Sequence, residues 1–482
     1  MAEANCWKPI IGLEIHLQLE TKAKLFAPEA NTYEESPNTK VSEVSLAEPG
    51  ALPVINQKAV TDAIRLGLAF NCKIAGRLEF DRKNYFYPDL PKGYQTTQYR
   101  NPLGREGYIE LKDDQRIALQ SLHLEEDSAK SSQSTDSLAG LDFNRSGLPL
   151  VEIVTSPTIH NETTAVEVVK EIATISRYLE ISQANMEKGS LRCDINISLR
   201  DASSGKTSNR TEIKNLNSRS QIKQALAYET DRQKKLMQEG EQWPPESRTF
   251  DPKHRKTIPM REKELSENYR YFPEVDLLPC PIEKASLEKL KASLPEKPSA
   301  KFARFIEAYG LATQDAAFLT EEPERAVFFE DMAGLIPARQ ATLWIKGPIQ
   351  KELKKQNLSL QQSRLNPEKI KELIDQIENH NITRETAENK ILPALINKKD
   401  LNIRNFITKN ELTTVGDTEE IDKAIAELMD HFPEETARLK NGETRLIGFF
   451  IGELTRKLYG KVDPRIIRKH LLEALEKKNN QE

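Results

Sequence analysis

Cysteine is scarce in this chain of 482 residues, and the four cysteines lie far apart in the sequence. No two of them form a C-x-x-C pair, so a zinc site of the usual spacing is not expected. Disulfide frameworks are dense in small secreted proteins, and four scattered thiols do not form such a framework. We therefore expect a reducing compartment for the thiols, which are Cys6, Cys72, Cys193 and Cys280.

The chain has neither a long hydrophobic run nor an excess of charge of one sign. Its apolar stretch Leu446–Ile451 is far shorter than the roughly 20 residues that span a bilayer, and residues 1–8 do not resemble a signal or transit peptide. With 70 basic and 74 acidic residues, the net charge of -4 disfavours general coating of nucleic acid but permits a local basic patch. We expect a soluble, cytoplasmic protein with no membrane partner.

Two common nucleotide-binding motifs are missing. No G-x-G-x-x-G occurs, so a dinucleotide-binding fold is not expected. The tripeptide Gly205–Thr207 resembles the end of a phosphate-binding loop, but Arg200 stands where that motif needs glycine. The tripeptide also falls between two predicted strands rather than before a helix, so we interpret it as a hairpin loop.

Length and composition predict about three domains. Residues 1–293 are rich in predicted strands, and we expect an α+β catalytic domain built on an antiparallel sheet. Residues 294–408 place apolar residues at helical spacing and predict a helical domain, and residues 409–482 predict a small helical tail domain. Helices are expected over residues 162–179, 220–239, 298–309, 323–333, 367–380 and 384–395.

Four segments of the first domain alternate strictly between apolar and polar residues. In the first of them, Ile11 and Leu13 begin the apolar face, whereas Glu14 and His16 share the polar face. A strand repeats every two residues, so these two polar side chains point the same way, about 7 Å apart along the strand. The polar faces of the other three segments carry His123, Glu125, Asp127, Arg192, Asp194, Glu212 and Lys214.

Each alternating strand alone has an ordinary explanation, because a half-buried strand turns its polar face to water. Four such faces with carboxylates, two imidazoles and few neutralising partners favour another interpretation. Clustered carboxylates repel one another unless a cation lies among them. Oxygen ligands with one or two imidazoles suit Mg²⁺ or Mn²⁺ better than a structural zinc. The residues alone therefore predict metal-assisted phosphoryl or acyl-phosphate chemistry on a sheet.

Two segments mix aromatic residues with basic ones. One is Phe80–Asp89, in which Lys83 and Asn84 are candidates for contact with a nucleotide, and the other is Tyr269–Pro273. Aromatic rings stack on bases, and cations meet phosphate. A loop anchored by buried aromatic rings is an equally good interpretation of both segments, and the sequence does not decide between the two.

The run Ile11–His16 resembles the opening motif of the B subunits of the aspartyl/glutamyl-tRNA amidotransferases. The resemblance continues in order along essentially the whole chain, so it implies the fold and function of that family. The further matching segments are residues 80–88, 90–92, 94–95, 123–127, 144–145, 149–154, 189–194, 212–218, 269–273 and 448–464.

This resemblance implies an ATP-dependent amidotransferase, a carbon–nitrogen ligase with glutamine as nitrogen donor. ATP and Mg²⁺ would convert the side-chain carboxylate of mischarged Glu-tRNA(Gln) or Asp-tRNA(Asn) to an acyl phosphate, which ammonia would then convert to the amide. In the family a separate A subunit releases the ammonia from glutamine, and a small C subunit completes a heterotrimer. The sequence does not say which of the two tRNAs is the substrate.

The resemblance also implies residue roles. Asp194 lies on a motif of the kinase-site cluster, and Arg192 and Lys214 are our own candidates for phosphate contact, argued from the polar faces. The residues that match family positions near Mg²⁺ are Glu14, His16, Glu125 and Glu212. The basic residues expected to contact tRNA, unless they form a merely solvated helical face, are Arg456, Lys457, Lys461, Arg468 and Lys469.

The stretch between the first two motifs departs from many members of the family. Those members carry paired cysteines for zinc there, whereas residues 26–46 of this chain contain none, so we predict no zinc. Two other functions stay open on the residues alone. One is a non-catalytic tRNA-binding scaffold that kept the fold, and the other is a metal-dependent phosphotransferase for another carboxylate. Unpaired acids argue against the first, and the tail domain argues against the second.

Overall fold

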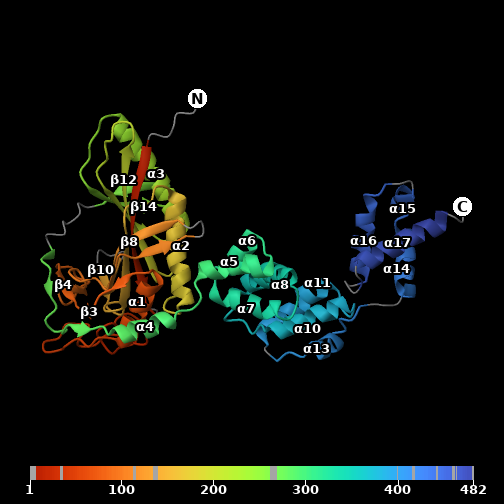
Figure 1. Ribbon diagram of the computed structural model, residues 1–482. Coiled ribbons are helices and arrows are strands. Elements are labelled where there is room, and N and C mark those ends of the chain that lie inside the picture. Colours follow the sequence, from red (N-terminus) through yellow and green to blue (C-terminus); the bar gives the residue numbers. More distant parts are fainter. Residues whose placement is uncertain are drawn as a thin grey trace. The chain divides into compact units, whose positions relative to one another are not determined.

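The computed structural model divides into two compact units, residues 1–303 and 304–482 (Figure 1). It describes residues 7–32, 36–111, 115–133, 139–260, 269–398, 400–414, 418–440, 443–458, 462 and 464–479. The division falls inside helix α5 (Pro298–Tyr309). The three predicted domain ranges stay a prediction. Among the described residues, no helix combines the length and the hydropathy that crossing a membrane requires.

Within the described residues, the first unit is built on a ten-stranded sheet in the order β15-β14-β13-β12-β1-β11-β8-β6-β2, with β7 beside β8. Its strands are antiparallel, as predicted, except that β13 and β14 are parallel. A parallel pair needs a crossover, which helix α3 (Arg219–Gln238) supplies. The strands are β1 (Trp7–Gln18), β2 (Lys73–Ile74), β6 (Gly104–Arg105), β7 (Tyr108–Glu110), β8 (Arg116–Glu126), β11 (Pro149–Thr155), β12 (Leu191–Asp201), β13 (Thr211–Leu216), β14 (Glu246–Asp251) and β15 (Lys256–Pro259).

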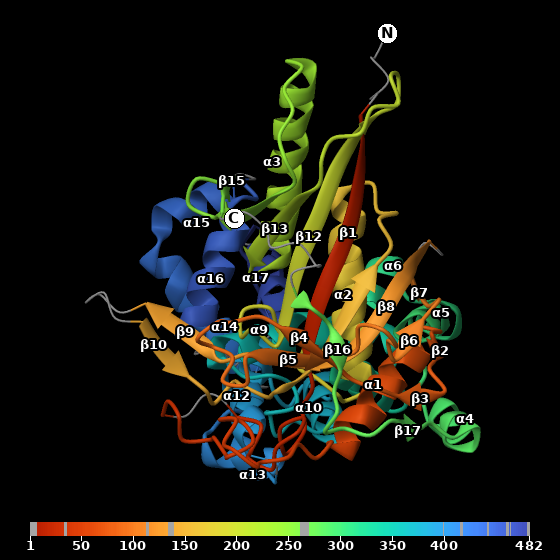
Figure 2. The ribbon, with the colours of Figure 1, turned by 90° about the vertical axis from the view of Figure 1, so that its left-hand side faces the viewer.

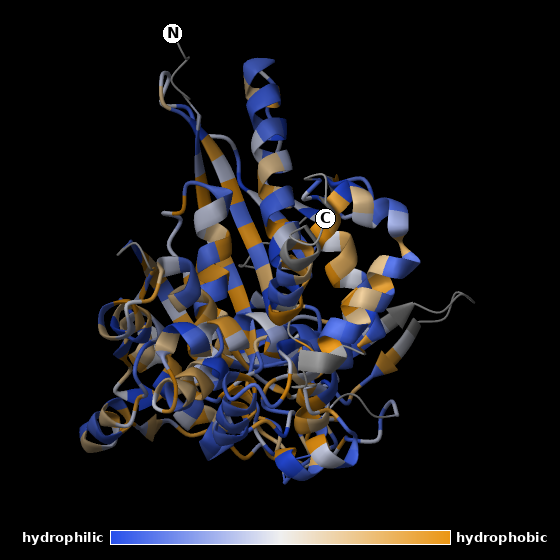
Figure 3. Ribbon diagram, turned by 90° about the vertical axis from the view of Figure 1, so that its right-hand side faces the viewer, coloured by the Kyte–Doolittle hydropathy of each residue, from blue (hydrophilic) through white to orange (hydrophobic). Residues whose placement is uncertain are grey.

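The core of this unit lies between one face of the sheet and three helices. The helices are α1 (Gln57–Ala69), α2 (Glu162–Tyr178) and α3. The predicted apolar face of β1 is almost fully buried, with Ile11 and Leu13 each 1% exposed. Bands of alternating hydropathy are visible along the long strands in Figure 3. Burial of each such side chain contributes about 1.5–3 kcal/mol.

Side-chain caps explain where these helices begin. The Asn161 side chain accepts a hydrogen bond from the Thr164 backbone N–H at 2.7 Å, and Ser218 does the same for Gln221 at 3.2 Å. Such caps satisfy amide groups that have no partner inside the helix. The helices predicted over 162–179 and 220–239 are therefore present, with ends that differ by one residue.

A three-stranded sheet, β16-β4-β5, lies over the opposite, polar face of the large sheet (Figure 2). The Gln98 side chain accepts from the Leu124 backbone N–H at 2.8 Å, and the Thr97 hydroxyl donates to Glu125 at 3.0 Å. These bonds join β5 to β8. The remaining elements of this unit are β3 (Arg77–Leu78), β4 (Asp81–Asn84), β5 (Tyr94–Thr97), β9 (Lys130–Gln133), β10 (Ala139–Asp142), β16 (Phe272–Pro273), β17 (Cys280–Pro281) and α4 (Lys284–Ala292).

Polar contacts of Lys24 and Lys40 stabilise the part of the chain in which the paired zinc cysteines of many family members are missing. The fully buried Lys24 ammonium donates to the Lys40 carbonyl at 2.8 Å and lies 3.2 Å from the Glu29 carboxylate. The Asn144 side chain accepts from the Lys40 backbone N–H at 2.7 Å. A buried ammonium is stable only with such partners, because its desolvation is costly. A buried lysine therefore organises these residues, and the zinc prediction stays a prediction.

The second unit is helical. The helices predicted over 298–309 and 323–333 have those ends, whereas the helix predicted over 384–395 contains the π-helical turn η3 (Ala387–Ile391). A similar turn, η2 (Ile345–Ile349), contains Pro348, which has no N–H to donate and shifts the helical bonding. The other helices are α6 (Thr313–Leu319), α7 (Pro323–Ala333), α8 (Ala338–Trp344), α9 (Gln350–Gln356), α10 (Pro367–Glu378), α11 (Arg384–Thr386), α12 (Leu392–Asn397), α13 (Ile403–Lys409), α14 (Thr418–His431), α15 (Pro433–Lys440), α16 (Leu446–Lys457) and α17 (Pro464–Asn479).

Gly107 lies where two chain segments approach closely. A Cβ at this position would lie 2.4 Å from the Cys72 sulfur and 2.9 Å from the Phe70 carbonyl oxygen. We predict that Gly107→Ala lowers the melting temperature by about 2 °C or more, because overpacking forces backbone shifts. Gly76→Ala is the control, since a Cβ there would meet nothing within 4 Å. Equal melting temperatures for the two variants in thermal unfolding would contradict this account.

Candidate active site

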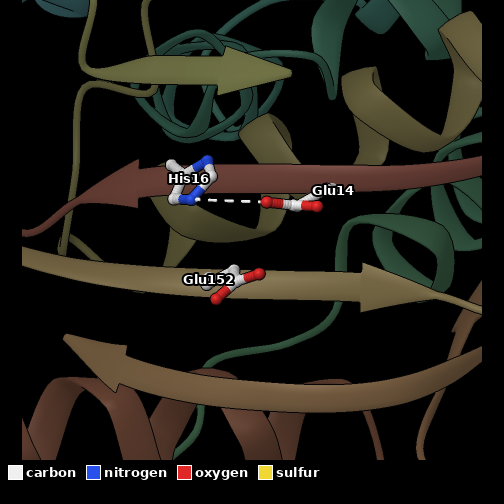
Figure 4. Close-up of side chains that lie close together, drawn as sticks. All are labelled: Glu14, His16 and Glu152. Carbon is white, nitrogen blue, oxygen red and sulfur yellow. Dashed lines mark ion pairs between the residues drawn. The ribbon is translucent and has the colours of Figure 1, made fainter. Parts of the chain in front are cut away.

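Strand register brings the polar side chains of the large sheet together. His16 on β1 is paired with Glu152 on β11, and Glu152 is paired in turn with His123 on β8. Directly paired residues on one face of a sheet have neighbouring side chains. Glu14 points the same way as His16, as the alternation predicts, and its carboxylate lies 4.0 Å from the His16 Nε2 atom (Figure 4).

Glu14, His16 and Glu152, hereafter the metal group, have ligand atoms that all lie within 4.8 Å of one another. Oxygen ligands about 2.1 Å from one Mg²⁺ lie within about 4.2 Å of each other, so small side-chain movements would suffice. Burial and then the nearby Arg192 charge lower the pKa of His16 to about 3. The imidazole is therefore neutral at neutral pH, as a metal ligand must be. The donor set fits Mg²⁺ or Mn²⁺.

Buried acids lie in and around the metal group. Glu125 lies 3.5 Å from His16 Nε2, and burial raises its pKa to about 7, although Lys83 acts in the opposite direction. Burial also raises the pKa of Asp194 to about 6 and that of Glu152 well above its usual value. Mutual repulsion adds to the effect of burial on each acid. A cation in their midst would relieve both costs.

A pocket of about 810 Å³ opens onto this polar face. Its volume is in the range of small-molecule sites. Five of the side chains predicted from the sequence line it: Glu14, Lys83, Glu125, Glu212 and Lys214. The predicted residues thus come together from β1, β4, β8 and β13, which are far apart in the sequence.

Asp194 and Arg192, the predicted residues on β12, are not among those that line the pocket, but they lie beside it. Asp194 is 3.4 Å from the Lys214 ammonium, and the Glu212 carboxylate accepts from the Ser247 hydroxyl at 2.8 Å. Glu212 is on β13, which β12 separates from β1. The Arg192 guanidinium donates to Asp127 at 2.7 Å, so it holds a neighbouring acid.

Asn84 holds the segment Tyr269–Pro273 in place. Its amide donates to the Arg270 carbonyl oxygen at 2.8 Å. This bond ties β4 to the segment that contains Tyr269 and Tyr271, and both of these rings line the pocket. The two rings therefore form an aromatic wall beside the polar face, and contact of this segment with a nucleotide stays a prediction.

His123 is neutral and fixed in one tautomer. Its Nδ1 atom lies 2.7 Å from the Gln98 carbonyl oxygen, which can only accept, so Nδ1 carries the hydrogen. Its Nε2 atom then accepts from the Ser121 hydroxyl at 2.8 Å. Burial lowers the pKa of the ring to about 4. His123 therefore orients its neighbours without adding charge at neutral pH.

Among the pocket-lining residues that the sequence did not single out, four have charged or aromatic side chains: Tyr99, Arg105, Glu152 and Arg210. Glu152 is the single acid in the otherwise apolar run Leu148–Val154. A lone carboxylate in an otherwise apolar stretch that is expected to form a strand is the signal that identifies it. The other three lie at strand ends or in loops, where no alternation marks them.

The predicted tRNA-contacting residues lie on the last two helices. Arg456 and Lys457 are exposed on α16, and Arg468 and Lys469 are exposed on α17. Lys457 pairs with Glu427 at 2.7 Å. Lys461 lies outside the described residues. The basic side chains are thus accessible, and their role stays a prediction.

The raised pKa of Glu125 makes stability depend on pH. With a folded pKa of about 7, the carboxyl binds its proton more tightly than in an unfolded chain, where the pKa is about 4.3. The metal-free protein therefore loses stability as the pH rises between these two values. We predict that Glu125→Gln, which cannot ionise, gains melting temperature relative to the wild type from about pH 5 to about pH 8.

The exposed Glu20 provides a baseline for this measurement, because Glu20→Gln also removes one carboxylate. Thermal unfolding of both variants in chelator, and again with Mg²⁺, separates the contributions. Saturating Mg²⁺ should reduce the gain for Glu125→Gln, since the cation stabilises the ionised carboxylate. A gain that does not change with pH would refute the buried, proton-binding state of Glu125.

Comparison with known proteins accounts for both units. Residues 9–288 match the family described as the GatB/GatE catalytic domain, and residues 327–475 match the GatB domain. The B subunit of the aspartyl/glutamyl-tRNA(Asn/Gln) amidotransferase from Thermodesulfovibrio yellowstonii is 39% identical over 97% of this chain and 99% of its own length. The protein of the same name from Nitrosococcus oceani is 40% identical over 98% of this chain and 99% of its own length.

A third relative is the B subunit of the glutamyl-tRNA(Gln) amidotransferase from the organellar chromatophore of Paulinella chromatophora. It is 39% identical over 98% of this chain and 98% of its own length. The identity extends over both units in each of the three relatives. The chain therefore belongs to the family of tRNA-dependent amidotransferase B subunits.

Proposed function

We propose that this chain activates and amidates the side-chain carboxylate of Glu or Asp carried on a mischarged tRNA. The observation that carries the proposal is the metal group, because two of its members, Glu14 and Glu152, line one pocket together with the Lys83 ammonium. The family supports it, because the relatives are named for Asp/Glu-tRNA(Asn/Gln) or Glu-tRNA(Gln). Gln-tRNA(Gln) or Asn-tRNA(Asn) would be the product.

Activation is needed because a carboxylate is a poor electrophile. In the proposed sequence, a carboxylate oxygen attacks the γ-phosphorus of ATP, the bond to ADP breaks, and an acyl phosphate forms. Ammonia then attacks the acyl carbon, inorganic phosphate leaves, and the nitrogen loses a proton to give the amide. Catalysis of the first step rests mainly on positioning and on stabilisation of negative charge.

Residues of the pocket suit these tasks. The metal group would hold Mg²⁺ with Glu125 beside it, and the bound cation would neutralise charge on the phosphate oxygens. The Lys83 ammonium lies 4.9 Å from the centre of the Tyr269 ring, which holds it without neutralising it. Lys83 would therefore meet a phosphate oxygen directly. Lys214, Arg105 and Arg210 also line the pocket as cations.

Two partner subunits and tRNA complete the proposal. This chain shows no amidase set of two serines and a lysine, so a separate A subunit would release ammonia from glutamine, with a C subunit as the third partner. The exposed arginine and lysine side chains of α16 and α17 support contact of the tail with tRNA. A non-catalytic scaffold fits less well, because buried acids with raised pKa values cost stability that mere tRNA binding does not require.

Substitution of the metal group tests the proposal. In a complex reconstituted with the A and C subunits, we expect Glu152→Gln to lower amide formation on Glu-tRNA(Gln) and Asp-tRNA(Asn) by about 100-fold or more, because a Mg²⁺ ligand is lost. The loss should be equal with glutamine and with ammonium chloride as nitrogen source. Glutamine hydrolysis on the A subunit should persist.

The matched control is Glu110→Gln, which removes a carboxylate from the edge strand β7. It should retain wild-type amide formation. Deacylation of the tRNA at successive times releases the amino acids, and the ratio of amide to acid among them gives the rate of amide formation. Wild-type activity in Glu152→Gln would remove the metal group from the mechanism, and a wild-type complex without amide formation on either tRNA would refute the function.

A further inference from the structure

Four tyrosine rings form a row, and three of them, Tyr99, Tyr269 and Tyr271, line the pocket. Tyr85 and Tyr269 meet edge to face at 5.8 Å, and Tyr269 meets Tyr271 in the same way at 6.1 Å. The last pair differs, because Tyr271 and Tyr99 are parallel, with ring centres 3.9 Å apart and planes only 7° from each other. The row ends in a flat, two-ring stack, hereafter the tyrosine platform.

The tyrosine platform is not an ordinary core contact. Tyr99 is 53% exposed, so one side of the stack is open to solvent. Both rings line the pocket, together with the apolar side chains of Pro102 and Val154 and the cationic side chain of Arg105. A flat aromatic surface with an adjacent cation is the usual surface on which a nucleobase stacks beside its phosphate.

The platform also lies beside the reacting groups. Val154 shares the polar face of β11 with Glu152, two residues away along the strand. Burial and then the charge of Glu152 raise the pKa of the Tyr271 hydroxyl. A base on the platform would therefore carry its ribose and phosphate, or its ribose and esterified amino acid, toward the metal group.

We propose that Tyr99 and Tyr271 form a stacking platform for an adenine base that places its attached group at the metal group. The inference rests on the proposed function, because both substrates of that reaction carry adenine. ATP has one, and a tRNA ends in an adenosine whose ribose bears the amino acid. The ligand common to both is an adenosine whose ribose carries either a triphosphate or an esterified amino acid. An experiment can separate these two sources, ATP and the charged tRNA.

The test uses the fluorescent base 2-aminopurine, whose emission falls when it stacks on an aromatic ring. One probe is 2-aminopurine riboside triphosphate, and the other is an aminoacylated tRNA with 2-aminopurine as its terminal base. Each is titrated into the reconstituted complex of all three subunits. We expect the wild type to quench one probe, and Tyr99→Leu to lose that quenching with an about tenfold higher KM for the matching substrate.

Two further variants make the result specific. Tyr99→Phe keeps the ring and should quench as the wild type does. Tyr87→Leu is the matched control, since Tyr87 is also 53% exposed but does not line the pocket. It should leave the fluorescence of both probes unchanged. Because Tyr99 is half exposed, its replacement by leucine leaves the core intact, and a melting curve verifies this.

Each outcome decides the question. Loss of quenching for the triphosphate alone identifies the ATP adenine as the occupant, and loss for the tRNA alone identifies the terminal adenosine. Equal quenching of both probes in Tyr99→Leu and the wild type overturns the platform even when the complex forms amide. A wild-type complex without amide formation refutes the proposed function instead, and quenching of the triphosphate still decides the platform.

Discussion

A buried carboxylate is stable as an anion only beside positive charge, and the polar face of the large sheet gathers several such groups. Glu14, Glu125 and Glu152 lie around one neutral imidazole, and burial raises the pKa values of the latter two acids. Removal of Glu125 and Glu152 from water costs stability, and the Thr97 hydroxyl and the nearby Lys83 ammonium recover only part of it, since both pKa values stay raised. The arrangement is stable in its ionised form only with a cation, and that requirement determines what the pocket can bind.

The rest of the first unit serves this requirement. Helices α1, α2 and α3 bury the apolar face of the sheet and hold its register, so that His16 stays opposite Glu152. The three-stranded sheet covers the polar face and lowers its access to water. Its strand β4 adds Lys83, and the segments next to β5 and β16 add the tyrosine platform, so that a cation and an aromatic surface lie beside the acids. Exclusion of water strengthens each of these electrostatic contacts.

Strict alternation made much of this site predictable from the sequence. Period two places Glu14 and His16 on one face whatever the neighbouring strands are, and the structure agrees. Glu152 escaped prediction because the run Leu148–Val154 is otherwise apolar, so the sequence shows no alternation there. The parallel pairing of β13 with β14 depends on a crossover that local pattern does not reveal. Tyr99 comes from a loop whose position is set only by tertiary contacts.

The site as a whole depends on the binding of one divalent cation by the metal group. Titration of the metal-free complex with Mn²⁺, followed by the electron paramagnetic resonance signal of the free ion, tests it most directly. We expect one bound Mn²⁺ per copy of this chain, which Mg²⁺ displaces, and an affinity for Mn²⁺ that is at least about tenfold lower in Glu152→Gln. Equal Mn²⁺ binding by the wild type and Glu152→Gln would contradict it.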